Sequence, residues 1–124
     1  MCTANTMDPS YGEWRVIKKA RGKYVKGLLD LLILTVLKEK EMSGYDLIGY
    51  VYRTFEVLLS PGTLYPMLDN LEHMGLIEGI DQGRKKLYKL TNKGEVLCRS
   101  LSLEYMKITS RAAFLQTHEQ PKIY

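Results

Sequence analysis

The fold is decided by one stretch, Ser60-Pro-Gly-Thr-Leu-Tyr-Pro-Met-Leu-Asp-Asn-Leu-Glu-His-Met-Gly75. Ser60 is a typical helix N-cap, Pro61 suits the first helical position, and Gly75 is placed to end the helix. The first turn offers hydroxyl groups and unpaired backbone N–H groups, which suit phosphates and base edges. We therefore expect a helix over residues 61–74 whose N-terminal end faces nucleic acid.

Pro66 lies inside the second turn of this expected helix. There it removes one backbone hydrogen bond, and it disfavours helical angles at Tyr65. One interpretation is that the front of the helix is shaped for a DNA groove. The plainer alternative is that the helix begins only after Thr63, and the sequence leaves both open.

The composition bounds the class of protein. A chain of 124 residues, 45% hydrophobic and 26% charged, suits one globular domain, and a net charge of +4 favours an acidic partner. Cys2 and Cys98 lack metal-ligand spacing, and His73 and His118 have no catalytic partner at a familiar spacing. We expect no metal, no cofactor and no enzymatic activity. Without a signal-peptide pattern or a membrane span, the expected location is cytoplasmic.

Two helices are expected before the Ser60 helix. The segment from Leu28 to Lys40 is apolar almost all the way round, which is typical of a buried helix. Ser43 and Asp46 then form a capping box, and Tyr45 places a hydroxyl group at that helix start, where a phosphate can approach. Followed by the Ser60 helix, this is the chain order of a helix-turn-helix.

The sequence after this recognition helix alternates between apolar and polar residues. Residues 76–80 and 86–90 are expected to form a β-hairpin with Gly83 in its turn. The tip of this hairpin, residues 81–86, carries Arg84, Lys85 and Lys86. We interpret the hairpin as a wing that holds DNA phosphates. The alternative is an edge hairpin that is protected by its lysines.

The two ends of the chain are expected to form a dimer interface. The last helix, residues 92–117, carries an apolar seam of Leu97, Leu101, Ile108 and Leu115, with Tyr105 and Ala112 beside it. A helix this long has no partner within so small a domain, so we expect a second subunit there, together with Trp14 of an N-terminal helix.

The N-terminal segment is strongly basic, with six cations and no acidic residue between Arg15 and Lys26. Lys18, Lys19 and Lys23 are candidates for phosphate contacts. The alternative is a solvated helix face. The segments before residue 10 and after residue 117 are expected to be disordered or flexible.

Several motifs, in their order and spacing, resemble PadR-type transcriptional regulators: Ser43-Gly-Tyr-Asp46, Ser60-Pro-Gly-Thr-Leu-Tyr-Pro66, Met74-Gly-Leu-Ile77, Arg84-Lys-Lys-Leu-Tyr88 and Leu90-Thr-x-x-Gly94. The resemblance covers residues 27–95 and continues as a helix to about residue 117. It implies homodimers that bind palindromic operators, usually as repressors, some of them released by small phenolic or hydrophobic ligands.

Carried over by position, the resemblance implies DNA contacts from Tyr45, Ser60, Thr63, Tyr65, Arg84, Lys85 and Lys86. Pro61 and Gly62, in the same first turn, are further DNA-binding candidates. This chain departs from many relatives at Asp69 and Asn70, where they have Lys or Arg, and its recognition helix has neither cation anywhere. The bidentate Arg-to-guanine contact is therefore not available from this helix. We expect readout through hydroxyl, backbone and shape contacts, with the charge supplied by the wing and with the N-terminal segment as a second candidate source.

The predicted fold is mainly α with a small β-hairpin, a winged helix-turn-helix. Its expected parts are a basic arm (1–26), a DNA-binding domain (27–91), a dimerisation helix (92–117) and a tail (118–124). The predicted function is that of a homodimeric repressor on a palindromic operator, released by a small aromatic or hydrophobic ligand. Tyr11, Trp14, Tyr24 and Tyr105 are placed either to line a pocket for that ligand or to fill the interface core. The alternative function is a winged-helix module for protein contacts or for architectural nucleic-acid binding without operator specificity.

Overall fold

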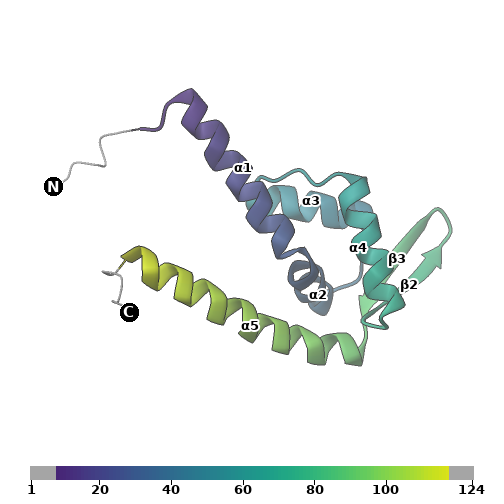
Figure 1. Cartoon of the computed structure of the whole chain (residues 1–124). Helices are drawn as coiled ribbons and strands as arrows, with labels where there is room; N and C mark the ends of the chain where they lie inside the picture. Colours follow the sequence, from purple (N-terminus) through teal and green to yellow (C-terminus); the bar gives the residue numbers. More distant parts are fainter. Residues whose placement is uncertain (1–7, 118–124) are drawn as a thin grey trace.

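The structure is a computed structural model, and it describes residues 8–117 (Figure 1). Its elements are, in chain order, α1 (Tyr11–Gly27), α2 (Leu29–Glu39), β1 (Met42–Ser43), α3 (Gly44–Phe55), α4 (Pro61–His73), β2 (Ile77–Gln82), β3 (Lys85–Leu90) and α5 (Asn92–Thr117). The predicted fold class, mainly helical with a small antiparallel hairpin, is confirmed. The expectations for residues 1–7 and for the tail 118–124 lie outside the described residues.

The sheet has one strand more than predicted. β1 pairs with β3 through Met42↔Tyr88 and Ser43↔Leu87, so the strand order is β1-β3-β2. The hairpin itself is longer and its turn tighter than expected, because Gln82 pairs with Lys85 across a turn in which Gly83 has a φ of +68°. A positive φ at that place is cheap only for glycine.

The helix-turn-helix is built by its caps. Ser43 accepts a hydrogen bond from the Asp46 N–H, and the Asp46 carboxylate accepts one from the Ser43 N–H, both at 3.1 Å, as the predicted capping box requires. α3 ends at Phe55, and its C-cap Glu56, with a left-handed φ of +57°, turns the chain toward α4. Behind both helices, α2 lies in the core, with Leu34 fully buried. This helix-turn-helix therefore stands on a buried apolar support.

The end of α4 is fastened to the start of α5. After the helix, the Leu76 N–H donates to the Leu71 carbonyl at 3.0 Å and Gly75 has a φ of +78°, which is a Schellman ending. The Thr91 hydroxyl donates to the carbonyls of Gly75 (2.7 Å) and Leu76 (3.0 Å) and accepts from the Gly94 N–H (3.0 Å). Thr91 is thus the N-cap of α5.

The first half of α5 packs on its own chain. Leu97 and Leu101 lie against the apolar core beside α2, and the Tyr105 hydroxyl donates to the Asp30 carboxylate at 3.0 Å and the Gly27 carbonyl at 3.3 Å. The prediction that this helix has no partner within its own domain is therefore wrong for this half. The reason is that α2 offers apolar side chains on the side of α5 as well as toward α4.

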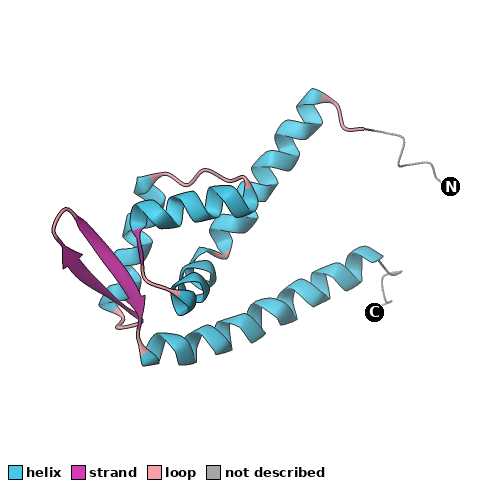
Figure 2. Ribbon diagram, turned by 180° about the vertical axis from the view of Figure 1, so that it is seen from behind, coloured by secondary structure: helices cyan, strands magenta, loops and turns pink. Residues whose placement is uncertain are grey.

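The rest of α5 and most of α1 extend away from the body of the domain. Figures 1 and 2 show both helices reaching to the same side, opposite the hairpin. Trp14, Ile108 and Leu115 are 43%, 54% and 50% exposed, and Ala112 is exposed as well. These two exposed helical faces are where the sequence predicted a second subunit. None of the helices within residues 8–117 combines the length and the hydropathy that crossing a membrane requires.

We expect Gly94→Ala to destabilise the protein strongly. A methyl group at position 94 would overlap the Leu76 carbonyl oxygen and lie 2.7 Å from a methyl carbon of Leu90, so α5 would have to shift. The expected loss in the free energy of unfolding is about 2–3 kcal/mol. Denaturant unfolding of both proteins at equal concentration measures it.

Gly22→Ala is the matched control. A methyl group at Gly22 meets nothing within 4 Å, and the residue lies inside α1, so this variant should gain about 0.5–1 kcal/mol. Equal stabilities of the two variants would contradict the close approach of α5 to the end of α4.

Candidate nucleic-acid interface

The start of α4 is an exposed, pre-formed helix end. The Ser60 hydroxyl oxygen accepts from the Thr63 N–H at 3.2 Å and donates to the Thr63 hydroxyl at 3.1 Å, and Pro61 occupies the first turn. Because the Thr63 hydroxyl accepts that bond, its own proton stays available to an outside acceptor. Ser60, Pro61 and Gly62 are all exposed. This helix end therefore offers hydroxyl and backbone donors to a ligand without rearrangement.

Pro66 lies within α4, which is continuous from Pro61 to His73. The alternative that the helix begins after Thr63 is therefore wrong, and Tyr65 remains helical. The cap at Ser60 and the proline at the first position fix the first turn, and Gly62 is exposed, so water can take the place of the missing hydrogen bond at its carbonyl.

Tyr65 joins the recognition helix to the start of α3. A methyl group at Gly44 would lie 2.5–2.7 Å from three atoms of the Tyr65 phenol, so the ring rests directly on the Gly44 backbone. Tyr65 is 39% exposed, whereas its neighbour across this contact, Tyr45, is 81% exposed. Of the two predicted tyrosine contacts, Tyr45 is the more accessible, and Tyr65 also has a packing role.

The capping box of α3 adds a fixed negative charge beside this contact. Hydrogen bonding with Ser43, chiefly through its backbone N–H and then through its side chain, lowers the pKa of Asp46, and the nearby Lys85 lowers it further. Asp46 is therefore ionised at neutral pH and completes the α3 cap. The positive charge of Lys85 lies close enough to influence it across the groove.

One groove of about 400 Å³ brings the predicted elements together. Its walls are the start of α3, the second turn of α4 and the hairpin, and its lining residues are Ser43, Gly44, Tyr45, Asp46, Tyr65, Arg84, Lys85, Lys86 and Tyr88. Five of the nine predicted DNA-contacting residues thus line one surface: Tyr45, Tyr65, Arg84, Lys85 and Lys86. Ser60, Pro61, Gly62 and Thr63 do not line the groove and form the exposed front of α4.

The hairpin cations divide into two kinds. The Lys86 ammonium is 3.2 Å from the Glu72 carboxylate and 5.5 Å from the centre of the Tyr88 ring, and its hydrogen bond with Glu72 raises its pKa. Arg84 and Lys85 are exposed and make no ion pair within residues 8–117. The two cations nearest the turn are therefore the ones available to an external anion.

The comparison with protein families decides the identity. The model of the transcriptional regulator PadR-like family matches residues 33–100, which is more than half of the chain. The chain belongs to this family. PadR-like proteins are transcriptional regulators and not enzymes, and the matched segment contains α3, α4 and the hairpin.

Solved PadR structures share the fold. A PadR family transcriptional regulator from Eggerthella lenta aligns with a TM-score of 0.76 and 22% identity, over 89% of this chain and 100% of that one. A PadR-like transcriptional regulator from Bacillus cereus aligns with a TM-score of 0.70 and 26% identity, over 78% of this chain and 99% of that one. The first of these likenesses shows the fold alone.

Among curated proteins, the transcriptional activator GvpE of Haloferax mediterranei is 27% identical over 104 residues. The match covers 75% of this chain and 54% of the activator, so this chain spans about half of the length of that relative.

The N-terminal cations lie far from the groove. Lys18, Lys19 and Lys23 are exposed on α1, which projects to the side of the PadR fold opposite the hairpin (Figure 1). Arg21 on the same helix lies 3.8 Å from Glu56. The structure therefore does not bring these residues together with the groove residues.

Sequence reasoning missed Glu72 and Gly79 at this site. Glu72, on α4, contacts both strands of the hairpin, through the Gly79 N–H at 3.1 Å and the Lys86 ammonium at 3.2 Å. The signal was Gly79 itself, because a glycine inside a strand marks a place where another group approaches the backbone closely. Which group approaches could not be read from the chain.

We expect the contribution of Asp46 to stability to depend on pH. A carboxylate whose pKa is lowered by folding stabilises the native state above its unfolded pKa, and this contribution is lost as pH falls through the folded pKa. Asp46→Asn should thus lower the free energy of unfolding by about 0.5–1 kcal/mol at pH 7, and the difference should shrink below about pH 4.

Urea unfolding at pH 7 and at pH 3 checks this expectation. Asp69→Asn, which removes the same charge from the exposed surface of α4, serves as the control and should change stability by less than about 0.5 kcal/mol. A difference between wild type and Asp46→Asn that stays constant across this pH range would contradict the assigned cap.

Proposed function

We propose that this PadR-like protein is a sequence-specific repressor that binds a palindromic operator as a homodimer. The observation that carries the proposal is the groove, in which exposed Tyr45, Tyr65 of the recognition helix and the exposed cations Arg84 and Lys85 share one surface. In this proposal, residues 61–74 enter the major groove and the wing, residues 81–86, lies along the phosphate backbone.

Eight residues form the proposed DNA-facing surface: Tyr45, Ser60, Pro61, Gly62, Thr63, Tyr65, Arg84 and Lys85. The ninth predicted contact, Lys86, lines the same groove, but its ammonium is paired with Glu72. Exposed cations at the hairpin turn supply charge, which carries affinity for any sequence. The front of α4 supplies hydroxyl and backbone donors, and these can read base edges and groove shape without an arginine. Sequence preference is thus assigned to α4, and phosphate binding to the wing.

The proposed homodimer uses the two helices that leave the domain. Exposed apolar residues on α1 and on the second half of α5, among them Trp14, Ile108 and Leu115, would be buried by a second copy. With α1 assigned to the partner subunit, Lys18, Lys19 and Lys23 are secondary candidates for phosphate contacts.

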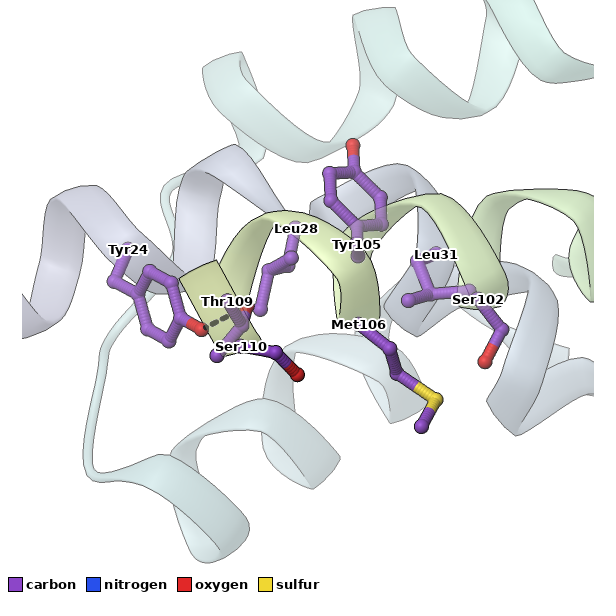
Figure 3. Close-up of a pocket in the computed structure, with 8 residues that line it drawn as sticks. All are labelled: Tyr24, Leu28, Leu31, Ser102, Tyr105, Met106, Thr109 and Ser110. Carbon is purple, nitrogen blue, oxygen red and sulfur yellow. Dashed lines mark hydrogen bonds between the residues drawn. The ribbon is translucent and has the colours of Figure 1, made fainter. Parts of the chain in front are cut away.

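Release by a small aromatic or hydrophobic ligand is a second candidate feature. A groove between α1, α2 and α5 is lined by Tyr24, Leu28, Leu31, Ser102, Tyr105, Met106, Thr109 and Ser110 (Figure 3). Its volume of about 230 Å³ is below the range of about 300–1,000 Å³ of most ligand sites, so one chain provides only part of such a site. Trp14 and Tyr11, which the sequence grouped with Tyr24 and Tyr105, do not line it. Displacement of bound DNA by a planar aromatic compound would support this candidate.

Fluorescence anisotropy tests the main proposal. The purified protein is titrated against the DNA upstream of its own gene and against a scrambled duplex, at two salt concentrations. We expect binding to the native duplex to be tighter by about a hundredfold or more. Equal and steeply salt-dependent binding to both would favour the architectural alternative, and no binding to either would favour a module for protein contacts.

Lys85→Ala tests the assignment of the wing. Loss of one phosphate contact should weaken binding about equally for both duplexes and lower the salt slope by roughly one unit per protomer. Lys107→Ala, at an exposed position in the second half of α5, removes the same charge outside the groove and should leave the slope unchanged. The same slope for both variants would argue against a wing that touches phosphate.

A further inference from the structure

One carboxylate connects the recognition helix to both strands of the wing. Oε2 of Glu72 accepts from the Gly79 N–H of β2 at 3.1 Å, and Oε1 accepts from the Lys86 ammonium of β3 at 3.2 Å. The two side chains of this ion pair are 40% (Lys86) and 32% (Glu72) exposed, so water reaches the pair only in part. A single side chain of α4 therefore touches two different strands.

Gly79 provides the passage for this connection. A methyl group at position 79 would overlap Cε of Lys86 and lie 3.1 Å from the Glu72 carboxylate. The Lys86 side chain therefore runs across the face of β2 at the place where that strand has no side chain. On the way its ammonium lies 5.5 Å from the centre of the Tyr88 ring, which is itself buried.

The hairpin does not need this connection in order to pair. β2 and β3 are matched at six consecutive positions, from Ile77↔Leu90 to Gln82↔Lys85, and their root is fixed by Thr91. Pairing with β3 fixes β2 within the hairpin, and the two-residue β1 ties β3 to the start of α3. The tilt of the hairpin against α4 is left to side chains. The Glu72 contacts lie between the root and the turn, where they oppose a change of that tilt.

We propose that Glu72, Gly79 and Lys86 form a clasp that sets the angle between wing and recognition helix, so that Glu72 and Lys86 are positioning residues for operator discrimination and not DNA contacts. This inference rests on the proposed function. The recognition helix can lie in the major groove while the wing cations contact the DNA phosphates only if helix and wing have one particular relative placement. The clasp also withholds one cation from phosphate, which limits binding to any sequence.

Three variants open the clasp in different ways. Glu72→Gln removes the charge, Gly79→Ala pushes Lys86 aside without changing the net charge, and Lys86→Met removes the cation and keeps its apolar stem. Glu78→Gln is the matched control, because Glu78 pairs with Lys89 at 3.9 Å within the same hairpin and makes no ion pair with α4. Thermal unfolding of each variant shows that it is folded.

The measurement is the affinity for two duplexes over a range of salt concentrations. One duplex is the tightest binder that wild type selects from a random-sequence pool, and the other is its scrambled counterpart. We expect the ratio of the two affinities to fall about fivefold or more in all three variants and to be unchanged in Glu78→Gln. In Glu72→Gln and Gly79→Ala, the freed Lys86 should also tighten binding to the scrambled duplex and raise the salt slope by about one unit per protomer. If these residues had only a structural role, their substitution would weaken binding to both duplexes.

Other results overturn the inference in recognisable ways. An unchanged ratio in folded Glu72→Gln and Gly79→Ala would show that the clasp does not govern discrimination. A salt slope that falls by one unit per protomer in Lys86→Met would make Lys86 a direct phosphate contact. If wild type selects no preferred duplex, the proposed function fails and this inference fails with it. If Gly79→Ala does not fold, the other two variants, which leave the strand backbone unchanged, decide.

Discussion

The arrangement of the recognition helix, the hairpin and α5 depends on the hydrogen bonds of the Thr91 hydroxyl. This hydroxyl bonds the carbonyls of Gly75 and Leu76, where the recognition helix has just ended, and it caps α5 through Gly94. The hairpin begins and ends at this point, so the end of α4, the base of the wing and the start of α5 meet there. Gly94 permits this because any side chain there would strike the Leu76 carbonyl. The four-residue segment from Thr91 to Gly94 thereby fixes α4, the hairpin and α5 relative to one another.

From that root, the candidate DNA surface is assembled by a few contacts between elements. Tyr65 rests on Gly44 and so fixes α4 against the start of α3. Glu72 reaches the wing at Gly79 and Lys86, while Arg84 and Lys85 stay exposed nearer the turn. The groove is thus formed by packing between the helices and the hairpin. Its exposed cations, Arg84 and Lys85, lie at the end nearest the hairpin turn.

Local signals were readable from the sequence, and signals between distant residues were not. The caps at Ser43 and Ser60 depend on neighbours within three residues, so α3 and α4 could be predicted nearly to their first residue. The two-residue strand β1 was missed because its pairing partner is far away in the chain. For the same reason, the support that α2 gives to α5 was not foreseen. At the candidate site, the residue types were predicted, but the engagement of Lys86 by Glu72 depends on how α4 packs on the hairpin.

The pairing of β1 with β3 has a consequence for the order in which the chain folds. Met42 and Tyr88 close a loop that contains all of α3, α4 and β2. Closing so long a loop from an unfolded chain costs entropy, and that cost falls once the enclosed helices have docked and already hold its ends together. β1 should therefore join the sheet late in folding, after α3 and α4, which lie within the loop that its pairing closes. The wing would gain its attachment to the start of α3 only in a molecule whose helix-turn-helix is already complete.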